Sequence, residues 1–214
     1  MSHRLTRGRD MTDQNAVRED IAFMRTLAEE GRAGAPLGGS ILIASGLAFG
    51  SASLAIWAGV TWRLLRHDWD VAVIWTAAMA LFLGYLFLAK AAWGGKKGGT
   101  SRAVGIAWSA AGWSIFFVGL SLAVMAVHGK DAYVGNAFMP FILAIYGSCW
   151  FVAAALSRAR WLYAVAFGSF GMALVAAWFA AEGITLYLVY GLSLYALGAA
   201  PGFVLTLQAR KQAA

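Results

Sequence analysis

The ionisable side chains of this sequence lie at the edges of its apolar runs, and none lies near the middle of one. Six of them group at three such edges: His67, Asp68, Asp70, His128, Asp131 and Glu182. Histidine and carboxylate groups can together bind zinc or a similar ion. Their spacing here is not that of a metal site, so we predict ordinary interfacial polarity and no metal.

The chemistry missing from the apolar runs excludes several classes of protein. A pump or proton relay needs a buried acid or histidine, and a b-type haem needs facing histidines. A hydrolase needs a base beside its nucleophile, and Cys149, the one cysteine, has none in its own run. Lys90 is near enough to the end of its run to extend to the interface. We predict no catalytic residues, no cofactor and no enzymatic activity.

The elements that carry these residues are membrane spans. The sequence is 61% hydrophobic and 13% charged, whereas about a quarter of the residues of a soluble domain are charged. A helix of about 20 apolar residues crosses a bilayer. We predict an all-α integral membrane protein, a six-transmembrane-helix bundle (36–208) with a short cytoplasmic N-terminal amphipathic helix. The predicted spans are 37–60, 71–93, 104–127, 136–156, 161–181 and 184–207.

The loop cations predict the orientation of these spans. With the N-terminus inside, fourteen of the 17 Lys and Arg residues fall in inner segments and three in outer loops. The prediction is a multi-pass protein of the bacterial inner (plasma) membrane with both termini in the cytoplasm. The net charge of +7 does not indicate nucleic-acid binding, because the cations form no basic stripe with interleaved aromatics.

The polar N-terminal segment divides into two parts. Residues 1–11 are predicted to be a disordered basic N-terminus, with Met1 and Met11 both open as the native start. Residues 12–35 are predicted to be an amphipathic helix and a linker, and 209–214 a cytoplasmic tail. Between Arg18 and Arg32 the helix has three positive and four negative charges. A helix that lies on an anionic bilayer is basic, so this one favours contact with protein.

Nine residues form the predicted partner-binding surface, four on one face of the helix and five in the basic inner loops: Val17, Ile21, Met24, Leu27, Lys96, Lys97, Arg102, Arg158 and Arg160. The protein surface that the helix meets is either its own inner loops or a separate partner. The pattern alone leaves both open.

Packing signals are frequent within the spans. Gly46 and Gly50 form a small-residue pair that lets helices approach closely. Pro201 is expected to kink or break the last span. Five aromatic residues could line a pocket for a hydrophobic ligand: Trp113, Tyr146, Trp150, Tyr187 and Tyr190.

Two functions fit these features. The leading hypothesis is a non-enzymatic regulator, tether or complex subunit that binds a cytosolic or membrane protein partner through its cytoplasmic helix and basic inner loops. The alternative is a small carrier or channel for a neutral or hydrophobic solute, which needs an aromatic path but no buried charge. Either function places the protein in the lipid bilayer, and a homo-oligomer is compatible with both.

Overall fold

Helices account for all regular structure in the described part of the protein. The computed structural model describes residues 21, 36–92, 99–129 and 132–213. The elements are α2 (Pro36–Thr61), α3 (Asp68–Ala92), α4 (Gly99–Gly129), η1 (Ala132–Ala137), α5 (Phe138–Ser157), α6 (Trp161–Phe179), η2 (Ala180–Glu182), α7 (Ile184–Leu194), η3 (Tyr195–Ala199) and α8 (Ala200–Ala213). An α-helix pairs its own backbone groups, which lipid cannot do for it.

Six helical stretches are long and apolar enough to cross a bilayer: Gly39–Thr61, Trp69–Ala89, Ala103–Gly129, Val134–Ser157, Trp161–Glu182 and Ile184–Lys211. The prediction of an all-α protein with six membrane-spanning helices is therefore confirmed. The last stretch combines α7, the π-helix η3 and α8. The predicted helix over 12–35 lies outside the described residues, apart from Ile21, which is helical and exposed.

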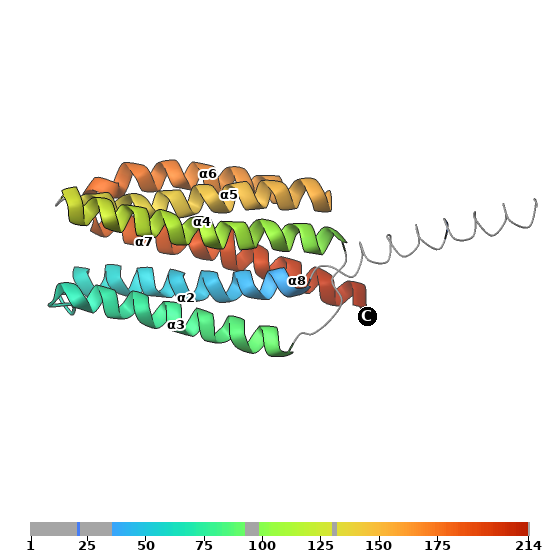
Figure 1. Ribbon diagram of the computed structural model, residues 1–214, viewed down its shortest axis with the longest axis horizontal. Helices are drawn as coiled ribbons and strands as arrows, with labels where there is room; N and C mark the ends of the chain where they lie inside the picture. The colour runs from blue at the N-terminus through green and yellow to red at the C-terminus, as the bar shows by residue number, and fades with distance from the viewer. Residues whose placement is uncertain (1–20, 22–35, 93–98, 130–131, 214) are drawn as a thin grey trace, which may run out of the picture.

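The six helices run side by side along one long axis (Figure 1). The closest pairs are α5 with α6 and α2 with the segment formed by α7, η3 and α8. On the outside, α3 packs along α2 and α4 packs along α5, but α3 and α4 do not pack along each other. Large apolar side chains such as Leu81, Phe87 and Phe116 are exposed on α3 and α4. These surfaces suit contact with lipid.

Small residues allow α2 to approach the last span closely. A Cβ added at Gly46 would lie 2.6 Å from the Ala199 backbone nitrogen, and one added at Gly202 would lie 2.6 Å from the Gly39 carbonyl oxygen. Only glycine fits at such a backbone contact. Gly46 thus acts as the predicted packing residue, with its partner on the last span.

Two short turns connect the helices at the end of the bundle that lies farthest from the C-terminus (Figure 1). After α2 the backbone turns at Arg63, which has a φ of 57°, and the N–H groups of Leu64 and Leu65 donate to the Gly59 carbonyl at 2.7 and 3.1 Å. Gly183, with a φ of 64°, turns the backbone between η2 and α7. Such left-handed positions end helices and reverse the direction of the backbone.

Candidate functional site

Aromatic side chains of α4 and α5 meet inside the bundle. Trp150 is fully buried, and the ring of Trp108 stands edge-on to it at a centroid distance of 5.4 Å. The same Trp108 ring stands edge-on to Tyr146 at 5.3 Å. The Tyr146 hydroxyl lies beside the hydroxyl of Ser45 on α2. This contact brings α2 to the two helices that carry the rings.

A second group of rings, from α2, α3 and α7, continues from the first. Trp75 lies 6.5 Å from Tyr190 and 6.3 Å from Phe49, measured between ring centroids. The hydroxyl of Tyr187 lies beside the Trp75 side chain. Tyr190 is also close enough to Tyr146 for their hydroxyl groups to interact electrostatically. We call the combined set the aromatic cluster: Phe49, Trp75, Trp108, Tyr146, Trp150, Tyr187 and Tyr190.

The π-helix in the last span lies beside this cluster. The donor that an α-helix would supply to the Leu197 carbonyl is the N–H of residue 201, which is proline and has none. The indole Nε1–H of Trp150 donates to that carbonyl at 2.9 Å. The π-helix η3 directly precedes α8, in which the proline is the second residue. Trp150 therefore donates a hydrogen bond to a carbonyl that receives none from residue 201. This accounts for the orientation of the indole N–H of α5 toward the last span.

The structure gathers four of the five predicted pocket residues and separates the fifth. Tyr146, Trp150, Tyr187 and Tyr190 all belong to the aromatic cluster. Trp113 is 66% exposed on the outer face of α4, where its ring packs with Phe116 and Phe117. Sequence analysis could not tell which face of α4 turns inward, because that helix is apolar all round.

Sequence analysis missed Trp75 and Trp108 as members of the cluster. Each resembles an interfacial tryptophan in the sequence, because it lies within the first part of its span. Trp75 is nevertheless seven residues past the start of α3, which at 1.5 Å per residue is about 10 Å deep. The predicted span began at residue 71, which put Trp75 close to its end, so the sequence alone did not separate it from a belt residue.

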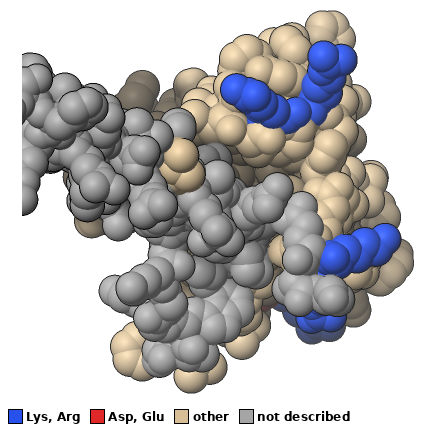
Figure 2. Space-filling model, turned by 90° about the vertical axis from the view of Figure 1, so that its right-hand side faces the viewer, with Lys and Arg blue, Asp and Glu red and all other residues tan. Residues whose placement is uncertain are grey.

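One end of the bundle carries basic side chains only, as far as the structure describes it. Its exposed cations are Arg158 and Arg160 between α5 and α6, and Arg210 and Lys211 in the last turn of α8. Figure 2 looks onto this end, and its described atoms show two groups of Lys and Arg and no Asp or Glu. We call these four residues the cationic end.

The other predicted partner-binding residues are only partly described. Arg102 lies in the first turn of α4, which begins at the same end of the bundle as the cationic end. Its side chain is not described. Val17, Met24, Leu27, Lys96 and Lys97 lie outside the described residues.

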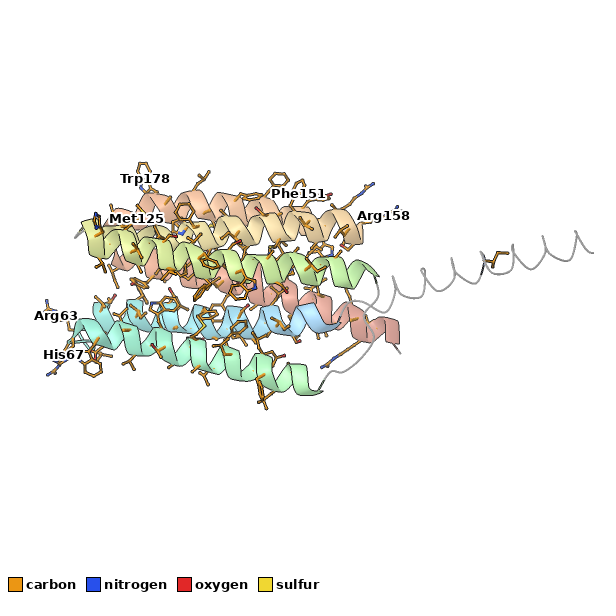
Figure 3. The ribbon with its side chains drawn as sticks, in the orientation of Figure 1. Arg63, His67, Met125, Phe151, Arg158 and Trp178 are labelled. Atoms are coloured by element: carbon orange, nitrogen blue, oxygen red, sulfur yellow. The ribbon has the colours of Figure 1, made fainter. Side chains whose placement is uncertain are left out.

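The opposite end of the bundle has mixed charge. Figure 3 shows Arg63 and His67 at this end and Arg158 at the other. The Asp70 carboxylate accepts hydrogen bonds from the backbone N–H groups of Arg66 and His67 at 2.9 and 3.0 Å. It thus pairs donors that the start of α3 leaves free. Within the described ranges no three His, Cys, Asp or Glu residues could hold one metal ion, and Asp131 lies outside them.

The aromatic cluster offers flat apolar faces and uncharged hydrogen-bonding groups. The hydroxyl of Ser45 donates to the Leu42 carbonyl at 3.1 Å, and that of Ser53 donates to the Tyr187 carbonyl at 2.7 Å. These serines stabilise the backbone, and no described base contacts them. The cluster has the groups to bind an uncharged molecule.

Comparison with known proteins assigns no family. No family model matches the sequence, and neither a curated protein nor a solved structure matches it.

Proposed function

We propose that this protein is a non-enzymatic membrane protein that binds an acidic segment of a protein partner at its cationic end. The observation that carries the proposal is the distribution of charge. Arg158, Arg160, Arg210 and Lys211 are exposed at the same end of the bundle, whereas the acidic residues among those described lie at the opposite end. Complementary charge steers partners to such a surface and selects among them.

The same distribution supports an orientation. Basic loops remain on the cytoplasmic side of a membrane. We therefore place the cationic end in the cytoplasm of a bacterial cell, with the protein in the inner membrane and both termini inside. The segment 12–35 leads directly into α2, which starts at that end. Its acidic and apolar residues are the second part of the proposed binding surface.

The test is affinity purification from native membranes in a mild detergent. One variant lacks residues 12–32, and a second carries Arg158→Glu and Arg160→Glu. The matched control carries Arg63→Glu and Arg66→Glu at the opposite end, which leaves the number of reversed charges the same. We expect a co-purifying protein to be lost from the first two variants and kept in the control. An identical set of proteins in the wild type and all three variants would contradict the proposal.

A second candidate function is a small carrier or channel for a neutral or hydrophobic solute. The observation that favours it is that uncharged polar groups lie within the aromatic cluster: the Tyr187 hydroxyl beside the Trp75 side chain, and the Tyr146 hydroxyl beside Ser45. Uptake into proteoliposomes tests it. Tyr146→Phe should slow uptake, whereas the charge-reversed variants of the cationic end should not.

A further inference from the structure

The hydroxyl group of Tyr190 is the one feature of the described interior that its own packing does not explain. Tyr190 is 3% exposed, and its hydroxyl has no hydrogen-bond partner among the described residues. Among those residues, every side-chain nitrogen or oxygen that is fully buried from solvent has a hydrogen-bond partner. The Tyr190 hydroxyl therefore borders a space that a water-sized molecule can reach.

An unpaired hydroxyl is costly at this position. Tyr190 lies six residues past the start of the sixth span, about 9 Å from its end. In hydrocarbon a polar group without a partner is destabilising, because lipid tails offer no hydrogen bond. A ligand that accepts a hydrogen bond would remove this cost.

The surroundings of the hydroxyl define the chemistry of that ligand. The Trp75 ring lies beside Tyr190 and continues to Phe49 and, at 5.3 Å further, to Phe82. Tyr146 is close enough for its hydroxyl to interact electrostatically with that of Tyr190. The charged residues of the described spans are all near the ends of helices, so the site favours an uncharged ring.

Two rings of the aromatic cluster lie on the outer helices of the bundle. Trp75 belongs to α3 and Trp108 to α4, and these two helices follow each other in the sequence without packing along each other. Figure 1 shows them apart, on either side of the ribbon of α2. Both tryptophans are only partly buried. A lipid-soluble molecule can therefore touch the exposed part of each ring.

We propose that Tyr190, Trp75 and Tyr146 bind the ring of an uncharged, lipid-soluble molecule with a ring carbonyl, of the quinone class, and that Tyr190 donates a hydrogen bond to this carbonyl. The ligand reaches the site from the bilayer, where the Trp75 ring is partly exposed. The site does not depend on partner binding at the cationic end. If the protein is a carrier, this ligand would be its solute. Binding at the site does not require that the ligand be transported.

The experiment measures binding and not transport, so that its result is separate from both proposed functions. The probe is an aryl-azide derivative of decylubiquinone, irradiated with the full-length protein in phosphatidylcholine proteoliposomes. Labelled peptides are identified by mass spectrometry, and unlabelled decylubiquinone is added as a competitor. We expect label on peptides of α3 and α7 that the competitor removes.

Two variants make the test specific. Tyr190→Phe removes the hydroxyl, and the loss of one hydrogen bond should raise the half-displacing concentration about fivefold to tenfold. Tyr195→Phe is the matched control on the same span, because the Tyr195 hydroxyl is already bonded to Ser51 at 2.6 Å. Its displacement curve should equal that of the wild type. If Tyr190→Phe does not fold, Trp75→Leu removes the flanking ring and should also weaken binding.

Three results would overturn the inference. One is a label that is spread over all lipid-facing helices and that the competitor does not remove. This would show that the probe only partitions into the lipid. Another is equal displacement in Tyr190→Phe and the wild type. The third is equal displacement by dodecylbenzene, which has a ring and an alkyl tail but no carbonyl.

Discussion

Replacing Trp150 by Phe tests how the bundle tolerates the proline in its last span. The substitution removes the indole N–H that donates to the Leu197 carbonyl at 2.9 Å, and it also removes part of a fully buried ring. A buried acceptor left without a partner costs about 1–3 kcal/mol, and hydrogen bonds between helices in membranes measure about 0.6–1.7 kcal/mol. We expect the hydrogen bond to contribute about 1 kcal/mol to the free energy of unfolding, a factor of about five in the equilibrium constant.

A double-mutant cycle separates the hydrogen bond from the lost ring volume. Pro201→Ala supplies a backbone N–H at the α-helical position for the Leu197 carbonyl. In that background Trp150→Phe should cost about 1 kcal/mol less, because the carbonyl keeps a partner. The assay is SDS titration of the protein in mixed micelles, followed by far-ultraviolet circular dichroism. A cost of Trp150→Phe that is the same in both backgrounds would refute the assignment of the hydrogen bond to the proline.

Three further predictions follow from packing and exposure. Gly46→Val should lower the free energy of unfolding by about 1–3 kcal/mol, because the new Cβ would lie 2.6 Å from a backbone nitrogen of the last span. Gly112→Val is the control: nothing lies within 4 Å of a Cβ at that position, so the midpoint of the SDS titration should not change. Asp70→Ala should speed hydrogen exchange at the amide of His67, which donates to the Asp70 carboxylate, and Asp70→Asn, which keeps an acceptor, should do so less. Cys149 is 7% exposed, so a water-soluble maleimide should label it only after unfolding in SDS; rapid labelling of the folded protein would contradict its burial.

The number and type of the helices could be predicted from the sequence. An apolar run of about 20 residues in hydrocarbon must pair its own backbone groups, and an α-helix does so. A kink or break of the last span was predicted at Pro201, and the structure shows a π-helix just before α8, where the proline lies, within one continuous helical stretch. The partner of the freed carbonyl could not be predicted, because Trp150 is 47 residues away in the sequence. The face of each helix that turns inward could not be predicted either, because apolar residues occur on all faces of the helix.

The placement of Trp113 and Trp75 illustrates this limit. Both lie in apolar runs of similar composition, yet Trp113 is exposed and Trp75 contacts Tyr190. Helix rotation in a membrane is set by contacts with neighbouring helices and not by an apolar–polar contrast along the helix. The cationic end was easier to predict, because basic residues gather where spans end. The partner-binding role of Arg158 and Arg160 stays a prediction.

Site-specific photo-crosslinking in native membranes tests the proposed binding at the cationic end most directly. A photoreactive phenylalanine derivative is placed at Arg160 in one variant and at Arg66, at the opposite end of the bundle, in another. We predict a discrete crosslinked protein at position 160 that disappears when residues 12–32 are deleted, and none at position 66. The same adducts at both positions, or none at position 160, would contradict the account.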